Sequence, residues 1–258
     1  MGPKVSVVTV VYNGEAEIDQ TVQSVLTQNY ANIEYVVIDG ASSDGTMKRL
    51  EQHRDRLAAL VSEKDKGIYD AMNKGVAASS GDWIVFLNCG DRFFSDDALS
   101  IFNQTLDDTA DILYGDAVIR YHTFEKLLPK APVSEIWKGM PFCHQASFVK
   151  SQLLKKRPFD LRYKLSSDFN FFYQEFLAGS RFLFIPRVIC YFDYTRGASV
   201  ENSLTSIRER KTIVLQTGFN LHRWLYYSYF ITYVRLSIMG KRILGKRMSE
   251  WLIRSLKK

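Results

Sequence analysis

Apolar runs of strand length alternate with segments of helical spacing through the first hundred residues. Val5–Val11 reads as a buried strand, and after the turn at 12–14 the apolar residues of 15–28 recur every three or four positions. The same strand-then-helix unit recurs three times, with strands expected at 33–38, 58–61 and 83–87 and helices after Asp44, around 70–78 and after Ser95. This alternation predicts an α/β protein with a doubly wound, mostly parallel sheet.

The pattern is less regular after residue 110. A further strand is expected over 111–121, a helix over 166–177 and a short strand over 181–185. Polar loops are expected near 129–132 and over 191–202. With 258 residues and 46% hydrophobic content, the chain can bury one large core.

The cysteines and the first residues of the chain predict a cytoplasmic protein. Cys89, Cys143 and Cys190 are far apart and lack metal-binding spacing, so neither a disulfide framework nor a zinc site is expected. The first residues run from a single lysine into the first strand without an apolar segment of signal-peptide length.

The positive charge of the chain, a net +6, is concentrated at its C-terminal end. Residues 208–258 hold twelve Lys and Arg against two Glu, interspersed with aromatic and aliphatic side chains. This segment is expected to be a basic amphipathic helical tail, and the interleaved apolar residues favour an anionic membrane surface over nucleic acid. The stretch 224–239 is interrupted by Arg235 and is short of the roughly 20 residues needed to span a bilayer.

Two nucleotide-binding classes are excluded by the turns after the strands. The first such turn reads TVVYNGE, with one glycine, where a dinucleotide-binding fold needs GxGxxG, and no P-loop motif is present. Instead, Asp39 and Asp91 each follow a strand-like run. Since parallel strands bring their carboxyl ends to one edge, the pair suggests a nucleoside contact and a metal ligand there.

At this point the sequence resembles the inverting glycosyltransferases of family 2, which have the GT-A fold. The ordered motifs are TVVYN, VVIDGASSDGT, EKDKGIYDAMNKGVAASSGDWIVFLNCGD and SSDFNF. The resemblance is greatest to bacterial enzymes that build polysaccharides on lipid carriers. It implies a GT-A domain over 1–207, with a nucleotide-sugar half at 1–110 and an acceptor half at 111–207, followed by the tail at 208–258.

For the donor, the resemblance implies that Asp39 accepts the imide N–H of uracil, a donor that cytosine and adenine lack at that position. It also places Thr9, Val10 and Tyr12 along the uridine, with Asn13 fixing the turn. The alternatives are a turn or helix cap for Asp39 and a core position for Tyr12, whereas Asp44 is expected to be a cap rather than a ligand contact.

The metal motif of that family is DxD followed by a further aspartate, and the matching stretch here is Asn88-Cys89-Gly90-Asp91. Two leading carboxylates are therefore missing, and Asp91 alone is expected to hold Mn²⁺ or Mg²⁺ on the diphosphate, with Asn88 and Gly90 beside it. The alternative is a turn that simply ends the strand.

The remaining expected donor contacts are Asp65, Lys66 and Asn73 to ribose or diphosphate. Met72 stands where many relatives carry arginine, so Lys66 or Arg196 would have to supply that charge. Solvated surface charge is the alternative for both.

For catalysis, the resemblance places an acidic residue at the start of a helix below the acceptor, which is Asp168 in this sequence. Asp168 is expected to be the general base and His144 to contact the acceptor. A helix cap for Asp168 and a structural role for His144 are the alternatives.

The expected activity is metal-assisted, inverting transfer of a hexose-type sugar from a UDP-sugar to a glycan or polyprenyl-diphosphate-linked acceptor. The tail is expected to attach the enzyme peripherally to the inner face of the plasma membrane; packing on the domain or a homo-oligomer contact is the alternative. A nucleotidyltransferase and a non-catalytic sugar-nucleotide-binding or scaffold subunit are the competing functions.

Overall fold

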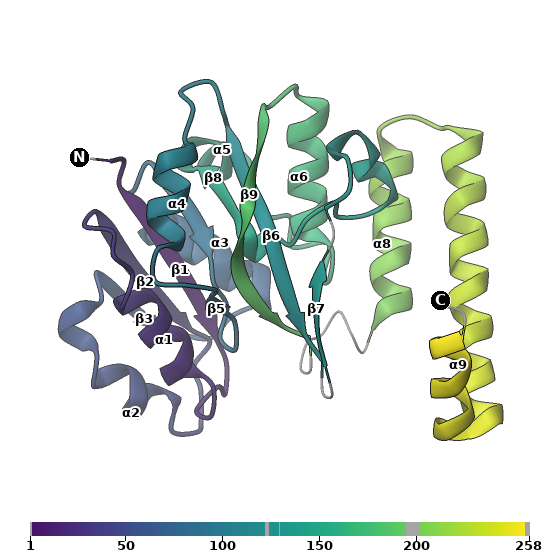
Figure 1. Ribbon diagram of the computed structural model, residues 1–258, viewed down its shortest axis with the longest axis horizontal. Coiled ribbons are helices and arrows are strands. Elements are labelled where there is room, and N and C mark those ends of the chain that lie inside the picture. Colours follow the sequence, from purple (N-terminus) through teal and green to yellow (C-terminus); the bar gives the residue numbers. More distant parts are fainter. Residues whose placement is uncertain (1, 122–123, 129, 195–201, 256–258) are drawn as a thin grey trace. The chain divides into compact units, whose positions relative to one another are not determined.

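The computed structural model describes residues 2–121, 124–128, 130–194 and 202–255 (Figure 1). The chain divides into two compact units, Met1–Gly197 and Ala198–Lys258. The sequence placed the boundary at 207, whereas here it precedes α8 (Ser203–Gln216), which belongs wholly to the second unit.

A nine-stranded sheet forms the centre of the first unit, with strand order β3-β2-β1-β4-β8-β6-β9-β5 and β7 paired to β6. The strands are β1 (Val5–Val11), β2 (Ile33–Asp39), β3 (Ala59–Ser62), β4 (Trp83–Phe86), β5 (Arg92–Phe93), β6 (Ile112–Arg120), β7 (Glu125–Leu128), β8 (Ser147–Lys150) and β9 (Phe182–Asp193). The four strands β3, β2, β1 and β4 are parallel, and β8 is antiparallel to both of its neighbours. This confirms the predicted α/β fold, with a mixed second half to the sheet.

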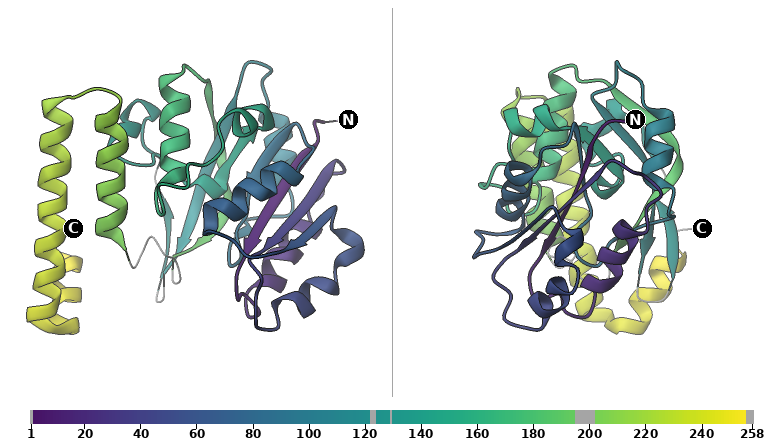
Figure 2. Two further views of the ribbon diagram at one scale, coloured as in Figure 1. Left: turned by 180° about the vertical axis from the view of Figure 1, so that it is seen from behind. Right: turned by 90° about the vertical axis from the view of Figure 1, so that its left-hand side faces the viewer.

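Helices cover both faces of the sheet. They are α1 (Ile18–Leu26), α2 (Thr46–Glu51), α3 (Ile68–Ala78), α4 (Ala98–Thr105), α5 (Ser151–Lys156) and α6 (Ser167–Leu177), with 3₁₀ turns at Arg54–Arg56, Val133–Lys138 and His144–Ala146. In Figure 1 α1 and α4 lie in front of the sheet and α3 lies behind it; the reverse view in Figure 2 brings α3 to the front.

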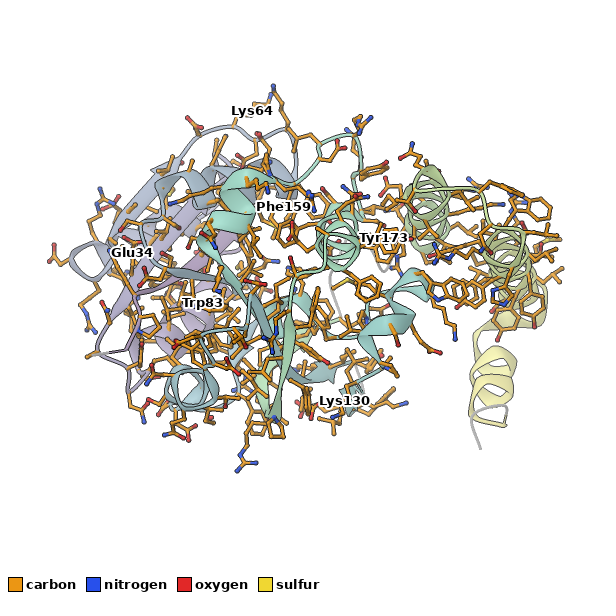
Figure 3. All side chains as sticks on the ribbon, turned by 90° about the horizontal axis from the view of Figure 1, so that it is seen from above. Glu34, Lys64, Trp83, Lys130, Phe159 and Tyr173 are labelled. Atoms are coloured by element: carbon orange, nitrogen blue, oxygen red, sulfur yellow. The ribbon has the colours of Figure 1, made fainter. Side chains whose placement is uncertain are left out.

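The inner strands are buried along their whole length, because helices cover both faces of the sheet. All seven residues of β1 are buried, and so is every residue of β4. Side chains fill the space around the sheet, where Trp83 lies in the interior (Figure 3) and packs edge-on against Phe102 at a centroid distance of 5.4 Å.

The second half of the first unit differs from the sequence expectation. β9 extends to Asp193, so the predicted loop over 191–202 is wrong for its first residues; Tyr191 and Phe192 pair with Val118 and Ile119 of β6. β5, β7 and β8 were not predicted, because their sequences RF, EKLL and SFVK contain no apolar run such as the WIVF that marks β4.

The second unit is helical. α8 packs on α9 (Leu221–Ser255), where the Lys211 amine donates a hydrogen bond to the Ser228 hydroxyl at 2.9 Å. In α9, large apolar side chains remain exposed over Leu221–Met239, namely Leu221, Trp224, Leu225, Tyr229, Tyr233, Leu236 and Met239. Within the described residues, no helix has both the length and the apolar content to cross a bilayer.

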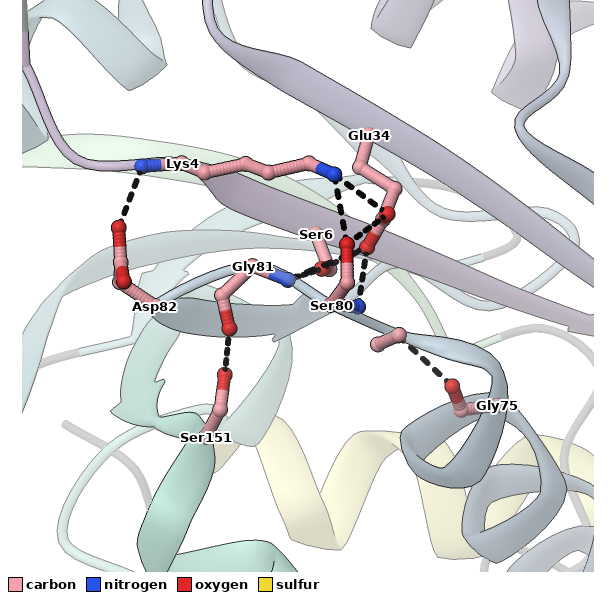
Figure 4. A network of polar contacts seen from close by, with 9 residues as sticks. Lys4, Ser6, Glu34, Gly75, Ser80, Gly81, Asp82 and Ser151 are labelled. Atoms are coloured by element: carbon pink, nitrogen blue, oxygen red, sulfur yellow. Dashed lines mark hydrogen bonds and ion pairs between the residues drawn. The ribbon is translucent and has the colours of Figure 1, made fainter.

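A buried carboxylate ties β1 and β2 to the start of β4 (Figure 4). Glu34 accepts hydrogen bonds from the Lys4 amine at 2.7 Å, from the Ser6 hydroxyl at 2.5 Å and from the Ser80 amide at 2.6 Å. Although burial alone would raise it, these hydrogen bonds together lower the pKa of Glu34 to about 2.

We expect Glu34→Gln to destabilise the protein by about 1.5–3 kcal/mol at pH 7, since it removes a charged acceptor from five donor groups. Because the folded pKa lies below the unfolded one, this stability is present above about pH 4.5 and is lost as the pH falls towards 2. Urea denaturation at pH 7 and pH 3 measures it, with the exposed Glu51→Gln as control. An undiminished difference at pH 3 would contradict the assignment.

Candidate functional site

A cavity of about 640 Å³ opens beside the carboxyl ends of β1 and β2 and the first turn of α3. It is lined by Val10, Val11, Tyr12, Gly40, Ala41, Lys64, Asp65, Gly67, Ile68 and Ala71. Ligands of open α/β sheets bind at this edge, outside the strand ends.

Asp39 lies fully buried where β2 ends, next in the chain to Gly40 of this lining. The sheet register pairs it with Val11 of β1 and Ser62 of β3. Its Oδ2 accepts hydrogen bonds from the Ser42 amide at 3.0 Å and the Ser62 hydroxyl at 2.6 Å, whereas Oδ1 has no hydrogen-bond partner among the described residues. Asp39 therefore fixes the turn, as the alternative expectation held, and also keeps one acceptor oxygen available.

Gly40 allows the side chains of Asp65 and Tyr12 to lie close to the backbone beside the cavity. A Cβ at this position would lie 2.9 Å from Asp65 Oδ2 and 3.4 Å from Tyr12 Cδ2, so a larger residue would push them apart. Tyr12 is 67% exposed, which rules out the core position. Asp65 is held by the Lys74 amine at 2.6 Å, a contact that the sequence analysis missed.

The loops around the cavity are fixed by short polar contacts. Asn13 takes a positive φ of 50°, and its Oδ1 accepts the Ser43 amide at 2.9 Å, so it fixes the turn as expected. Asp44 accepts the Thr46 amide at 3.0 Å at the start of α2, and the hydroxyl of Thr46 lowers the pKa of Asp44. Asp44 is thus a capping residue.

Three expected donor contacts lie elsewhere. Thr9 is fully buried and donates to the Leu87 carbonyl at 2.7 Å, so it is a core residue and does not line the cavity. Asn73 has a structural role: its Nδ2 donates to the Phe159 carbonyl and its Oδ1 accepts the Phe159 amide, at 2.9 Å each. Lys66 is exposed, and Lys64 lines the cavity in its place. Arg196 lies outside the described residues.

The stretch Asn88–Asp91 forms a tight turn after β4. Gly90 has a φ of +97°, which favours glycine, and the Asp91 amide donates to the Asn88 carbonyl at 2.9 Å. Asp91 is buried and its Oδ1 accepts the Asp193 amide at 3.0 Å. Burial raises the pKa of Asp91 to about 8. A cation beside Asp91 would lower this pKa and favour the charged carboxylate.

The turn offers part of a divalent-ion site. Within the residues that the structure describes, Asn88 Oδ1 is buried without a partner, and amide and carboxylate oxygens are ligands that Mg²⁺ and Mn²⁺ accept. Gly90 stands where the motif of the family has a carboxylate. A Cβ at Gly90 would be 3.9 Å from Asp193 Cβ, so Asp193 lies beside that position. Among the described residues, no three His, Cys, Asp or Glu side chains are grouped to hold a metal. An ion here would need diphosphate oxygens and water to complete its coordination.

Asp168 lies at the start of α6 and meets two side chains from distant segments. The Tyr69 hydroxyl of α3 donates to Asp168 Oδ1 at 2.8 Å, and His144 Nδ1 lies 3.3 Å from Oδ2. Burial opposes ionisation, but His144 and then Tyr69 outweigh it, and the pKa of Asp168 is lowered. Burial and the same carboxylate raise the pKa of Tyr69.

The sequence indicates Asp168 and His144 separately and gives no sign of the contact between them. It also missed Tyr69, whose position between Ile68 and Asp70 carries no sign of a partner 99 residues away. Gln145, which hydrogen-bonds Asp91 and receives the Cys143 thiol at 2.9 Å, was likewise missed.

The candidate site of this GT-A fold consists of the cavity at the strand ends, the adjacent Asp39, and the Asp168–His144 pair, which Tyr69 joins to the first turn of α3. The model of the family described as "Glycosyl transferase family 2" matches residues 6–173. The chain belongs to this family, as the motifs of the sequence predicted, and it is a glycosyltransferase.

Curated relatives are also glycosyltransferases by name. An uncharacterized glycosyltransferase of Mycobacterium tuberculosis is 34% identical over 204 residues, covering 75% of this chain and 76% of the relative. A PGL/p-HBAD biosynthesis glycosyltransferase of Mycobacterium bovis is 29% identical over 191 residues, covering 66% and 68%.

Solved structures share the fold. S. aureus TarS 1–349 in complex with UDP-GlcNAc has a TM-score of 0.70 at 17% identity, over 96% of this chain and 77% of that one. The mannosyltransferase PcManGT of Pyrobaculum calidifontis, in complex with GDP-Man and Mn²⁺, has a TM-score of 0.71 at 18% identity, over 99% and 79%.

Proposed function

We propose that this glycosyltransferase takes its sugar from a UDP-sugar and inverts the anomeric configuration. The observation that carries the proposal is Asp39 Oδ1 at the end of β2, a buried acceptor that has no partner in the described part of the chain and follows directly before the cavity-lining Gly40. Uracil can donate its imide N–H to such an oxygen, and the Tyr12 ring offers a surface for the base. TarS, which shares this fold, was solved with UDP-GlcNAc.

The reaction is a single displacement. The acceptor hydroxyl oxygen attacks the anomeric carbon from the face opposite UDP, its proton passes to an enzyme base, and the bond from the anomeric carbon to the diphosphate oxygen breaks. UDP leaves with that electron pair, so no covalent enzyme intermediate forms. The Asp168–His144 pair supplies the base.

The donor is tested by thermal shift with UDP, GDP, CDP, ADP and the common UDP-hexoses. A ligand at 100 times its dissociation constant adds about 2.7 kcal/mol of stability, so uridine nucleotides should stand out. Release of UDP from the stabilising UDP-sugar then separates an enzyme from a binding subunit. Equal stabilisation by UDP and GDP would contradict uridine selectivity.

We also propose that Mn²⁺ or Mg²⁺ binds the donor diphosphate at the Asn88–Asp91 turn. When bound, the ion would neutralise charge on the departing diphosphate. PcManGT, a mannosyltransferase of the same fold, was solved with Mn²⁺. Asp91 would bind the ion, with Asn88 and Asp193 placed beside it.

Asp91→Asn should abolish the gain in UDP affinity on adding Mn²⁺, while UDP alone binds as before. An asparagine can still accept the Asp193 amide through Oδ1, so the turn keeps its contact and loses only the charge. Calorimetric titration of UDP with and without Mn²⁺ measures this, and the exposed Asp108→Asn is the control. An unchanged Mn²⁺ response in Asp91→Asn would remove Asp91 from the site.

We propose further that the acceptor is lipid-linked and that α9 attaches the enzyme peripherally to the cytoplasmic face of the membrane. The exposed apolar side chains of Leu221–Met239 and the twelve basic residues of 208–258 are the two features that interfacial helices combine.

The triple variant Leu225→Ser/Tyr229→Ser/Leu236→Ser should lose liposome binding, because each apolar burial contributes about 1.5–3 kcal/mol. Flotation with anionic vesicles at low salt measures it, and high salt should weaken the wild-type protein as well. Leu127→Ser, at an equally exposed position on β7, is the control. If the wild-type protein stays in the soluble fraction at low salt, membrane attachment is wrong.

A further inference from the structure

Gly90, in the turn between β4 and β5, lies opposite Asp193 at the end of β9. β5 and β9 pair antiparallel, with Arg92 opposite Tyr191. Continuing this register by two residues brings Gly90 opposite Asp193, and opposed residues of neighbouring strands share one face of a sheet. The Asp193 amide donates to Asp91 Oδ1 at 3.0 Å, and this hydrogen bond holds the two segments together.

The space that a side chain at position 90 would occupy is open. Among the described residues, Asp193 Cβ, at 3.9 Å, is the only atom within 4 Å of a Cβ at Gly90, apart from the chain neighbours of the glycine. Gly90 and Asp193 are both partly exposed, whereas Asp91 is buried. The turn also adjoins the cavity, because the Cys89 amide donates to the carbonyl of the cavity-lining Val10 at 3.1 Å. Asp193 therefore lies on an open side of the turn, next to the donor cavity.

The backbone of the turn favours glycine at position 90. Its φ of +97° is one that an aspartate adopts only with strain. Thr21 of α1 fixes this conformation, since its hydroxyl accepts the Gly90 amide at 3.0 Å and donates to the Asp91 carbonyl at 2.8 Å. A carboxylate on the open side of the turn must therefore come from another segment, and Asp193 of β9 is placed to provide it.

Asp91 and Asp193 are close enough for their charges to interact. Burial is the main cause that raises the pKa of Asp91, and the negative charge of Asp193 raises it further. A divalent cation would relieve this repulsion. Asn88 Oδ1, buried without a partner among the described residues, is a further oxygen of the same turn that such an ion accepts.

We infer that Asp193 is a ligand of the divalent ion and supplies the carboxylate that the turn lacks at Gly90. This rests on the proposed function, in which Mn²⁺ or Mg²⁺ binds the donor diphosphate at the Asn88–Asp91 turn. The site then takes one carboxylate from the turn and one from the end of β9, whereas the family motif provides its carboxylates within the turn.

The first test is Asp193→Asn, which removes one charge and keeps the backbone amide that donates to Asp91. Thermal shift with saturating UDP and increasing Mn²⁺ gives the Mn²⁺ concentration at which half of the metal-dependent stabilisation is reached. We expect this concentration to rise at least about tenfold, the lower end of what the loss of a group supporting a metal site costs, while stabilisation by UDP without metal is unchanged.

Glu125→Gln is the matched control for this variant. The sheet register pairs Arg120 with both Asp193 and Glu125, so the control removes an equal charge from the same row of the sheet, two strands away from Gly90. Its Mn²⁺ requirement should equal that of the wild-type protein. An equal Mn²⁺ requirement of Asp193→Asn and Glu125→Gln would overturn the inference.

The second test separates a metal ligand from a residue that only shapes the turn. A thiolate prefers softer metals than a carboxylate does, so Asp193→Cys should shift the metal preference of the UDP complex from Mn²⁺ towards Cd²⁺ by at least about tenfold relative to Asp193→Ser. The same thermal-shift titration measures both metals. Equal Cd²⁺-to-Mn²⁺ preferences of the two variants would remove Asp193 from the coordination of the ion.

The wild-type protein and Asp91→Asn distinguish the two levels of the proposal. If neither Mn²⁺ nor Mg²⁺ adds to the stabilisation by UDP in the wild-type protein, the proposed metal site and the role of Asp193 are both wrong. If the wild-type protein responds to Mn²⁺, Asp91→Asn loses the response and Asp193→Asn keeps it, the metal site stands and only the assignment of Asp193 is wrong.

Discussion

Asp39→Asn should weaken UDP binding by about 1.5–3 kcal/mol, which is roughly a ten- to hundredfold loss of affinity. The asparagine can keep its carbonyl oxygen on the Ser42 amide and the Ser62 hydroxyl, so the turn after β2 stays intact. Its amide nitrogen then replaces Oδ1 and presents a donor to the imide N–H of uracil. Two facing donors repel, and the nucleobase loses its acceptor.

The same change should improve CDP relative to UDP, because the cytosine N3 atom accepts a hydrogen bond where uracil N3 donates one. Titration calorimetry of wild type and Asp39→Asn with both nucleotides measures this crossover. Ser62→Ala is the matched control, since it removes one hydrogen bond to Oδ2 and leaves Oδ1 in place. An unaltered UDP-to-CDP preference in Asp39→Asn would show that Asp39 does not contact the base.

Asp39 could be predicted because its position follows from local rules. A buried apolar run of strand length ends at this residue, and a turn rich in Gly and Ser follows. One short segment therefore indicates both the edge of the sheet and the polar side chain at it. The same reasoning placed Asn13 and Asp44 in the turns where the structure has them.

Thr9 and Asn73 show where that reasoning fails. Both lie close to motif residues in the sequence, but alternate side chains of a strand point to opposite faces, and the Thr9 hydroxyl is used inside the core by Leu87. Asn73 is claimed by the backbone of Phe159, 86 residues away. Proximity in sequence to a site gives no information on such distant partners.

Tyr69, His144 and Asp168 converge only through tertiary structure. They come from α3, from the 3₁₀ turn before β8 and from α6, and the short antiparallel β8, which the sequence did not predict, helps to set the position of His144. The base was therefore assigned to the one residue of the three that lies in a recognisable motif.

Asp168→Asn should reduce turnover by about 10²–10⁴-fold while the affinity for UDP is unchanged. Asparagine is close in shape to aspartate, so the start of α6 should keep its packing, which an unchanged melting temperature would verify. The neutral amide cannot take up the acceptor proton, and it no longer presents a charge to His144 Nδ1. Tyr69→Phe is the graded control: it keeps the ring packed on Phe159 and removes only the hydroxyl donor, so its loss of turnover should be smaller, about tenfold. Steady-state UDP release and UDP titration on the three proteins measure the series. If Asp168→Asn turned over as fast as the wild-type enzyme, neither the carboxylate nor the histidine that it orients would be the base, and deprotonation of the acceptor would have to occur elsewhere in the site.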